Sequence, residues 1–429
     1  MTNSHRVLFV EKSFGLSGST MSLATLLTHL DRQAYIALVA VSRPEQRDYL
    51  LRQIDGIDTV AVIDERASFA RTPTGARLLA LVCRHMPILR RPLLWLITAF
   101  DLFFSTVPYA LRLAWFGRSR CADLLHQNNG FDVGALLAAT LLRIPLVVFQ
   151  RGGEPPLLLS RLLAARVEHY VANSHATGTS LRSIGVPPGK IEVVYPPIDL
   201  ARFDPERPGR VRRDDLGLDP TAPCFGIVGQ LVQWKGHRVF LDAARRVLTA
   251  MPHARALIVG DAPSERAAYR TALEEQAATL GISDRVRFLG FREDVTDLLR
   301  LMDVVVHASV FPEPFGRVLV EAMSMKKPVV ASMAGGPLEI VEDGSTGFLV
   351  PAGDDAAMAG RILELLAAPE RARQMGEAGC KAASRFDVSV HMERVHALYA
   401  RLTPAPSIGR DCGGPLDDRA QSRRWRGLR

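Results

Sequence analysis

The chain has 429 residues, a length that suits two domains of ordinary size. Hydrophobic residues make up 48% of it and its formal net charge is +8, a composition typical of a globular enzyme and not of a fibrous or disordered chain. Residues 84–120 and 403–429 carry net charges of +5 and +3, which together equal the whole excess. A nucleic-acid-binding protein spreads its basic residues over a folded recognition surface, so this distribution argues against a nucleic acid as partner.

The five cysteines are scattered along the chain and show none of the spacings of a metal site. We therefore expect reduced thiols, as is typical of a cytoplasmic protein. The apolar run 6–10 is ended by Glu11 and Lys12, so it predicts a first strand and not a secretion signal.

Short apolar runs alternate with helical patterns through the first 200 residues, which favours a parallel α/β sheet. The expected strands are 6–10, 36–41, 58–63, 122–126, 145–149, 168–172 and 191–195. The clearest helical pattern begins after Ser19, where leucines recur on one face of a helix.

The segment 92–116 is long and apolar enough to suggest a membrane span. Asp101, Pro108 and Arg112 interrupt it, and a span here would place strands of one sheet on opposite sides of a bilayer. We instead expect a pair of helices within 90–120 that lies on a membrane surface. The side chains assigned to lipid contact are Arg90, Arg91, Arg112, Arg118, Arg120, Trp95 and Trp115. The alternative is a helix pair packed on the sheet or in a dimer interface.

A proline-rich, charged stretch at 196–223 is typical of an interdomain linker. A second alternation follows it, with expected strands at 224–228, 255–259, 286–289, 303–307, 328–331 and 348–350. Helices are expected at 237–250, 265–280, 294–301, 317–325 and 355–367. The fold class is therefore α/β, with two Rossmann-like doubly wound domains that face each other across a cleft.

The predicted domain boundaries follow from these patterns. The units are a first Rossmann-like domain at 1–200, a second Rossmann-like domain at 201–388, a helix at 389–402 that crosses back to the first domain, and a disordered basic tail at 403–429.

The turn after the strand 303–307 carries the strongest candidate site. A helix is expected to begin near Phe315, at the carboxyl end of a parallel strand, where open α/β sheets bind ligands. The free amides of residues 315–318, which are Phe315, Gly316, Arg317 and Val318, suit a phosphate. Glu313 and Glu321 flank these amides, and carboxylates accept hydrogen bonds from sugar hydroxyls. The competing interpretation is that both glutamates only satisfy the helix dipole.

Other strand ends are expected at the same cleft. Lys235, in the loop that begins at Gly229, is placed to reach a diphosphate from the opposite wall. The Gly290-Phe291-Arg292 turn is placed to frame a nucleobase, and the Gly335–Glu339 stretch predicts a flexible loop.

The order of these segments closely resembles the donor half of glycosyltransferase family 4. The matching segments run from Glu313 to Glu321-Ala-Met, then through Lys-Pro-Val-Val-Ala, Gly-Gly-Pro-Leu-Glu-Ile-Val and Asp-Gly-Ser-Thr-Gly-Phe-Leu-Val. The resemblance covers residues 222–400 well and the first domain more loosely. It implies the GT-B fold and sugar transfer with retention at the anomeric carbon. It also implies that Glu321 binds ribose, that Glu313 contacts the transferred sugar, and that Lys235 with the amides holds the diphosphate.

One position departs from the family pattern. Gln230 stands five residues before Lys235, where the family usually has an arginine that helps to neutralise the leaving diphosphate. Either another cation substitutes, with Arg317 as a candidate, or turnover is slower or lost.

The acceptor side is expected at three strand ends of the first domain. Gly18, which is assigned to the donor, lies in a Gly/Ser/Thr loop that precedes a helix, and this loop is able to approach a phosphate or an acceptor. Asn128 and Arg151 follow two strands, and Arg151 suits an anionic acceptor. A lone histidine after a strand is usually a loop residue, but the resemblance places His126 near the transferred sugar.

The sequence therefore predicts a retaining glycosyltransferase that uses a nucleotide sugar, needs no cofactor and no metal, and acts on a lipid-linked or glycan acceptor. We expect it on the cytoplasmic face of the cell membrane, in surface polysaccharide or glycolipid assembly. The alternatives are an epimerase or phosphorylase of the same fold, and an inactive membrane-bound scaffold.

Overall fold

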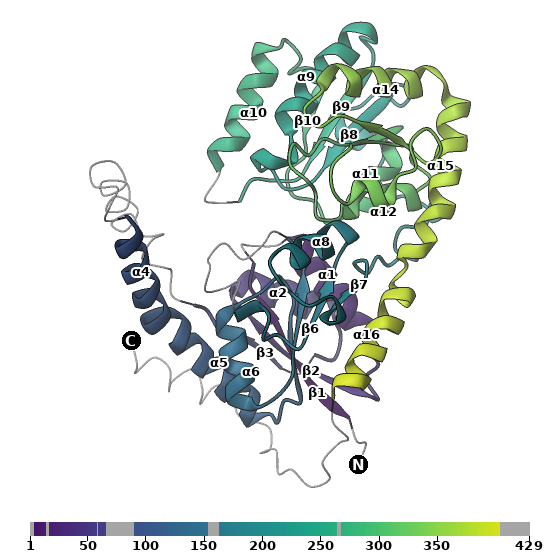
Figure 1. The fold of residues 1–429 in the computed structure, drawn as a ribbon. Helices are drawn as coiled ribbons and strands as arrows, with labels where there is room; N and C mark the ends of the chain where they lie inside the picture. The colour runs from purple at the N-terminus through teal and green to yellow at the C-terminus, as the bar shows by residue number, and fades with distance from the viewer. Residues whose placement is uncertain are drawn as a thin grey trace.

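A computed structural model describes residues 4–13, 17–57, 59–65, 90–152, 163–263 and 267–403. It shows two parallel sheets, each covered by helices on both faces, stacked one above the other (Figure 1). The α/β fold class predicted from the alternating patterns is confirmed.

The first sheet has seven parallel strands in the order β3-β2-β1-β4-β5-β6-β7. Its strands are β1 (His5–Glu11), β2 (Tyr35–Val41), β3 (Val60–Val62), β4 (Leu124–Gln127), β5 (Leu146–Gln150), β6 (His169–Ala172) and β7 (Ile191–Val193). Its helices are α1 (Gly18–Thr28), α2 (Pro44–Gln53), α6 (Val133–Leu142) and α8 (His175–Ser183), together with the helix of residues 90–119. The central strands are apolar and buried on both faces, as parallel sheets require.

The second sheet has six parallel strands in the order β10-β9-β8-β11-β12-β13. Its strands are β8 (Cys224–Val228), β9 (Arg255–Val259), β10 (Val286–Phe288), β11 (Val304–His307), β12 (Val329–Ser332) and β13 (Phe348–Val350). Its helices are α9 (His237–Ala250), α10 (Ala267–Thr279), α11 (Val295–Leu301), α12 (Arg317–Ser324), α13 (Pro337–Ile340), α14 (Asp355–Ala367) and α15 (Pro369–Ala383). All thirteen strands lie within two residues of the predicted ranges.

The last helix, α16 (Val388–Leu402), leaves the second domain and packs against the first, as Figure 1 shows along one side of the molecule. Val395, Leu398 and Tyr399 are buried in the same core as strand residues of β1, β4 and β5. Both domains therefore share the end of the chain, which ties them together.

The sequence analysis missed α15, because this helix carries few large apolar residues. Small residues replace them at its buried face, and Gly376 lies against the backbone of Lys326 so closely that a Cβ would come within 2.0 Å of a carbonyl oxygen. Such a helix packs by backbone approach, which a search for apolar periodicity does not detect.

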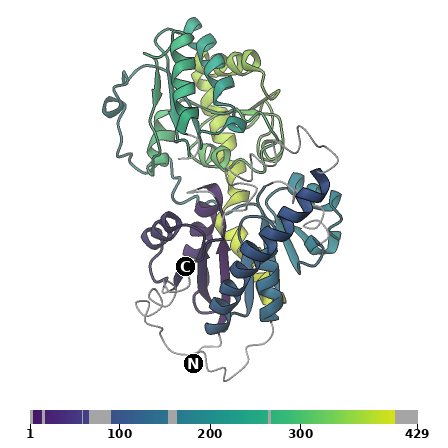
Figure 2. The same cartoon turned by 90° about the vertical axis from the view of Figure 1, so that its left-hand side faces the viewer.

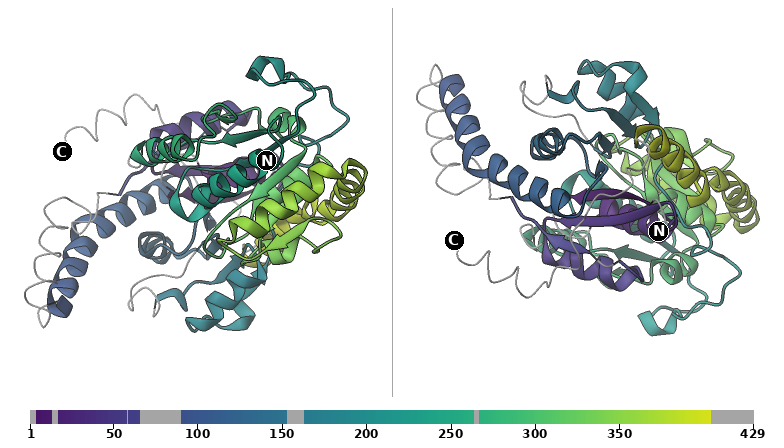
Figure 3. Two further views of the ribbon diagram at one scale, coloured as in Figure 1. Left: turned by 90° about the horizontal axis from the view of Figure 1, so that it is seen from above. Right: turned by 90° about the horizontal axis from the view of Figure 1, so that it is seen from below.

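The segment 90–119 is one long helix and not the predicted pair. It consists of α4 (Arg90–Asp101), a π-helical turn (Leu102–Thr106) and α5 (Val107–Ser119), and it projects from the first domain (Figures 2 and 3). The π-turn lets the helix continue through Pro108: Val107 N–H donates to the Leu102 carbonyl, and Pro108 then sits in the first turn of α5, where a missing N–H is tolerated. Residues 96–119 are long and apolar enough to cross a membrane, with 28% of the most apolar window buried.

The cysteines agree with the sequence analysis only in part. Cys224 and Cys380 are free thiols as expected, but Cys121 is disulfide-bonded, so the prediction of a reduced thiol is wrong there. Residues 84–89 and the tail beyond Thr403 lie outside the described residues.

Candidate functional site

Glu313 lies at the centre of a cluster formed where β11 ends. Its Oε2 accepts hydrogen bonds from Lys235 Nζ at 2.7 Å and from Ser309 Oγ at 2.9 Å, and it lies 3.3 Å from His307 Nε2. Glu313 is 6% exposed. The Lys235 ammonium also lies over the Trp234 ring, 4.3 Å from its centroid. The predicted acid and the predicted cation are thus in direct contact.

The environment keeps Glu313 ionised. Burial raises the pKa of this carboxyl, but the Lys235 ammonium and the hydrogen bond from His307 outweigh burial, so that the pKa lies well below its usual range. A buried carboxylate that retains its charge near neutral pH is suited to bind hydroxyl groups or to stabilise positive charge.

Two glycines hold the backbone of this turn in place. Gly336 N–H donates to the Glu313 carbonyl at 2.7 Å, and Gly335 forms a bridge with Glu313. A Cβ at either glycine would lie within 2.3 Å of backbone atoms of Glu313 or Phe315. The Gly335–Glu339 stretch, predicted to be a flexible loop, is therefore packed tightly against the site.

The N-terminus of α12 points into the same region. In the described part of the chain, the backbone N–H groups of residues 315–318 donate to no acceptor. Gly316 has a φ of 104°, which glycine adopts without strain. The ring of Phe315 is buried against Tyr195 and Phe386, so only its backbone faces a ligand. Free amides at a helix start are an anion-binding arrangement.

Glu321 forms the second acid–cation pair, with Arg317. Arg317 Nη2 donates to Glu321 Oε1 at 3.2 Å, while Nη1 donates to Ser22 Oγ at 2.9 Å and to the Pro197 carbonyl at 2.8 Å. Ser22 belongs to α1 of the first domain. The arginine therefore connects the predicted ribose-binding acid to the opposite wall of the cleft.

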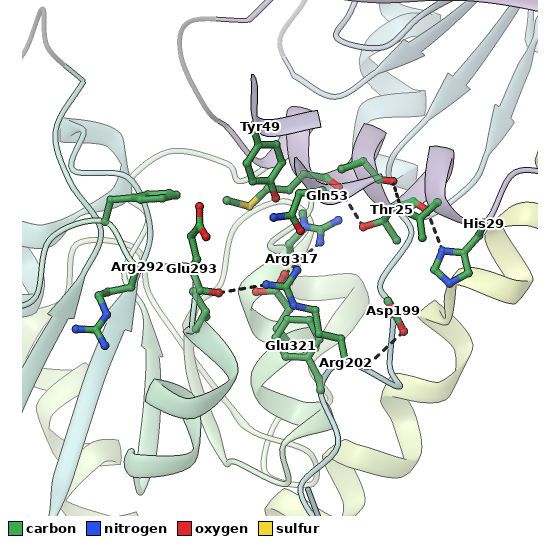
Figure 4. A pocket seen from close by; sticks show the side chains of 16 residues that line it. Thr25, His29, Tyr49, Gln53, Asp199, Arg202, Arg292, Glu293, Arg317 and Glu321 are labelled. Atoms are coloured by element: carbon green, nitrogen blue, oxygen red, sulfur yellow. Dashed lines mark hydrogen bonds and ion pairs between the residues drawn. The ribbon is translucent and has the colours of Figure 1, made fainter. Parts of the chain in front are cut away.

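A polar pocket of about 300 Å³ opens beside this pair. Figure 4 shows Tyr49, Gln53 and Thr25 on one side of it, and Arg292 and Glu293 on the other, with Arg317 and Glu321 between them. Phe291, 45% exposed, also lines the pocket. The residues predicted to hold a base and a ribose thus lie around one pocket, which both domains form.

The loop after β8 brings Gly229 and Gln230 to neighbouring strand ends. Gly229 N–H donates to the Val259 carbonyl, so this amide is already used within the sheet. A Cβ at Gly260 would lie 1.9 Å from the Gly229 carbonyl oxygen, so the loops after β8 and β9 are in close contact. Gln230 brings no charge to this corner, as expected.

In the first domain, Asn128 and Arg151 meet at the ends of β4 and β5. Asn128 is buried; its side-chain amide donates to Glu11 and to the Ser19 carbonyl, and its Oδ1 accepts from Arg151 Nη2 at 3.0 Å. Burial lowers the pKa of Arg151 to about 10, which leaves it charged at neutral pH. Gly18 is exposed at the start of α1. A Cβ at this position would lie 3.7 Å from Arg317 Cδ, so α1 begins close to the arginine of the other domain.

His126 does not face the cleft, contrary to the sequence prediction. β4 continues to Gln127, so His126 lies inside the strand and points, like Leu124, into the core that α16 covers. Its ring stacks on Phe149 at 3.9 Å and its Nδ1 is hydrogen-bonded to the Tyr399 hydroxyl. Burial holds the pKa of His126 well below its usual value, so it is a neutral core residue.

The sequence analysis missed two side chains of the Glu313 cluster, His307 and Ser309. Both belong to the His-Ala-Ser sequence at the end of β11, only six and four residues before Glu313, and this spacing was the available signal. Among the described residues, no group of three or more His, Cys, Asp or Glu side chains is arranged to hold a metal ion.

Two α/β domains joined across a cleft, with an ionised acid and free helix amides at the strand ends, define a glycosyltransferase of GT-B architecture. Family models agree: residues 17–202 match "Glycosyltransferase Family 4" and residues 210–382 match "Glycosyl transferases group 1". The chain belongs to glycosyltransferase family 4.

Named relatives support this assignment. The chain is 34% identical over 317 residues to a D-inositol 3-phosphate glycosyltransferase of Catenulispora acidiphila, a match that spans 70% of this chain and 71% of that protein. A similar enzyme of Segniliparus rotundus is 34% identical over 58% of this chain and 56% of its own length.

Solved structures share the fold over nearly the whole chain. Anabaena Alr3699/HepE, crystallised with UDP and glucose, superposes with a TM-score of 0.75 at 26% identity, over 93% of this chain and all of that one. A sucrose-phosphate synthase from Thermosynechococcus elongatus superposes with a TM-score of 0.71 at 19% identity, over 93% of this chain and 99% of its own.

Proposed function

We propose that the protein transfers a sugar, with retention, from a nucleotide sugar to a lipid-linked or glycan acceptor at a membrane surface, in cell-surface glycan assembly. The observation that carries the transferase part is the pair of acid–cation contacts, Glu313–Lys235 and Glu321–Arg317, on either side of the free amides 315–318. A nucleotide sugar has a hydroxylated ring on each side of its diphosphate, so one acid for each ring with amides between them matches its chemistry.

In this proposal the donor displaces the internal ion pairs. Lys235 and the amides bind the diphosphate, and Glu321 binds the ribose hydroxyls. Glu313 contacts the transferred sugar, and the base lies beside Phe291. UDP-glucose is the first donor to test, because it is bound in a solved structure 26% identical to this chain.

Replacing Glu321 with alanine is expected to weaken UDP binding by about ten- to a hundredfold, because the ribose loses hydrogen bonds to a charged group. Calorimetry with UDP on purified protein measures this effect. Glu364→Ala is the control, since Glu364 forms ion pairs with Arg361 of α14 and Arg371 of α15 and does not line the pocket. An unchanged Kd in Glu321→Ala would remove the ribose assignment.

The proposed chemistry needs no protein nucleophile and no metal. The bond from the anomeric carbon to the leaving phosphate breaks, the bond to the acceptor oxygen forms on the same face, and the leaving phosphate takes the acceptor proton. Lys235 and the amides stabilise the negative charge on the departing diphosphate. Gln230 adds no charge there, and Arg317 is the candidate substitute because it lies in the pocket beside Glu321.

The proposed membrane contact rests on the outer face of the helix 90–119. Six large apolar side chains on it are between 45% and 70% exposed: Leu96, Phe100, Phe103, Phe104, Leu111 and Trp115. An exposed apolar surface of this kind on a projecting helix suits the interfacial layer of a bilayer. Arg112 was expected to contact lipid phosphate but is instead hydrogen-bonded to the Asp64 carbonyl.

The double variant Phe103→Ser/Phe104→Ser is expected to lose most of the liposome binding of the wild type, because it removes the most prominent aromatic pair of this face. Flotation with vesicles that contain anionic lipid measures the bound fraction. Leu141→Ser, a change at an equally exposed apolar residue of α6, is the control. Equal flotation of the wild type and the double variant would contradict the membrane contact.

A second candidate acceptor is a soluble inositol phosphate, because the relatives at 34% identity are named for it. Nucleotide release is followed with UDP-glucose and other sugar nucleotides, with membrane lipid extract, inositol phosphate or inorganic phosphate as acceptor. Faster release with lipid extract supports the proposal, whereas faster release with inositol phosphate supports the second candidate. Phosphate-dependent release, or release into water alone, would indicate a phosphorylase or an epimerase. If no donor gave nucleotide release with any acceptor, the interpretation as an inactive scaffold would be favoured.

A further inference from the structure

Glu339 connects the donor-site turn to the opposite domain. It lies in α13 of the second domain, and its carboxylate accepts the backbone N–H groups of His175 at 2.9 Å and Ala176 at 3.0 Å. These are the first two residues of α8 in the first domain. The Tyr195 hydroxyl, also in the first domain, donates to the same carboxylate at 3.2 Å.

Two of the three bonds are made by backbone N–H groups at the start of a helix. A carboxylate at a helix start satisfies N–H groups that have no partner within the helix, and the helix dipole favours its negative charge. The next free amide of α8, that of Thr177, is already capped by Ser174. Arg385 holds the Glu339 backbone from the other side, through its carbonyl at 2.6 Å.

The same segment is fixed against the catalytic acid. Glu339 follows Gly336 by only three positions, and the Gly336 N–H donates to the Glu313 carbonyl at 2.7 Å. The Tyr195 ring lies 5.7 Å from Phe315 between ring centroids, so the first domain also contacts the residue that begins the free amides. The path from α8 through Glu339 to the turn of Glu313 is therefore short and tightly packed.

We propose that Glu339 is a positioning residue for the transfer reaction: it holds the two domains closed and thereby fixes the Gly335–Gly336 turn against Glu313. Glu339 is not among the residues that line the pocket between Glu321 and Tyr49. The inference rests on the proposed function for its kinetic part, but domain closure itself is measured without any substrate.

Hydrogen–deuterium exchange of the protein without ligand tests the contact directly. In Glu339→Ala, the amides of His175 and Ala176 are expected to exchange about tenfold faster or more, because they lose their acceptors. The hydrogen-bonded amides of Glu313 and Gly336 are expected to exchange faster as well, because the turn that they hold is no longer fixed. Glu339→Gln keeps the length and one acceptor oxygen, so it is expected to lie between the wild type and alanine. Glu342→Gln is the matched control, since Glu342 is exposed on the same segment, and its hydrogen bonds among the described residues run from its backbone to Ser345 and Thr346 of the same turn.

Kinetics then separate positioning from binding. Glu339→Ala is expected to lower kcat by about ten- to a hundredfold, whereas the Kd for UDP changes less than threefold, because Lys235 and Glu321 both belong to the second domain. Unchanged exchange at α8 overturns the inference, whatever the activity. An equal loss of kcat in Glu342→Gln also overturns it. So does a loss of kcat in Glu339→Ala and Glu342→Gln that is explained by a lowered melting temperature of both variants. Absence of turnover in the wild type would instead contradict the proposed function and leave the exchange result to decide the contact.

Discussion

Replacing Lys235 with methionine is expected to lower kcat by about a hundred- to a thousandfold, the usual effect of removing a group that stabilises charge in the transition state. Methionine keeps the length of the side chain and its packing on Trp234, but it removes the ammonium that contacts Glu313. Nucleotide release with UDP-glucose, under saturating acceptor, measures kcat.

The same variant is expected to change the pH dependence of the reaction. In the wild type the pKa of Glu313 is depressed, so the carboxylate stays charged throughout the mildly acidic range. Without Lys235, the largest contribution that lowers this pKa is lost while burial still raises it. We therefore expect kcat of Lys235→Met to fall as the pH decreases through the raised pKa of Glu313, a limb that the wild type lacks in that range.

Lys326→Met provides the control, because Lys326 forms an ion pair of the same 2.7 Å length with Glu206 on the exposed surface. Such a surface pair contributes little, and kcat should remain within about twofold of the wild type. If the two variants lost activity equally, or if Lys235→Met kept the wild-type kcat, Lys235 would have no role at the diphosphate.

The sequence predicted the features that depend on local pattern and on the topology of parallel sheets. Strand positions followed from short apolar runs, and Glu313 and Lys235 were expected at one cleft because the carboxyl ends of parallel strands share an edge. The structure brings these two side chains into contact over 78 positions of sequence separation. That prediction needed no knowledge of side-chain conformations.

The contacts between the domains could not be predicted in this way. The bond from Arg317 to Ser22 and the bonds from Glu339 to α8 depend on how one domain sits on the other, which no periodicity encodes. The prediction for His126 was wrong because β4 continues one residue beyond the predicted strand. A histidine within the strand points to the face that the alternation of side chains gives it. That face is covered by α16, whose Tyr399 lies 273 positions further along the chain.

Three buried histidines make the fold sensitive to acid. His126, His237 and His391 are each at most 3% exposed. Burial lowers the pKa of His237 to about 4 and that of His391 to about 3, and it holds that of His126 well below its usual value. In the unfolded chain a histidine has a pKa of about 6.5, so on acidification the unfolded state takes up protons that the folded state does not.

The free energy of unfolding is therefore expected to be fully retained above pH 6.5 and to fall below it. At pH 5, His237 and His391 each lower it by about 2 kcal/mol, since one pH unit below the unfolded pKa costs about 1.4 kcal/mol. The two together cost about 4 kcal/mol, a large fraction of the stability of a typical domain, and His126 acts in the same direction. Guanidinium unfolding at pH 7.5 and at pH 5.0 measures the difference.

His391→Gln isolates one of the three contributions. His391 Nδ1 lies 2.7 Å from the Tyr195 carbonyl, a bond that a glutamine amide is able to replace without a group that takes up a proton on unfolding. We expect the difference in unfolding free energy between the two pH values to shrink by about 2 kcal/mol in this variant. His253→Gln should leave the difference unchanged, because His253 is exposed to solvent in the folded protein as well as in the unfolded chain. If His391→Gln lost stability equally at both pH values and left the difference intact, His391 would contribute by packing and hydrogen bonding alone, and the acid sensitivity would have to arise elsewhere in the fold.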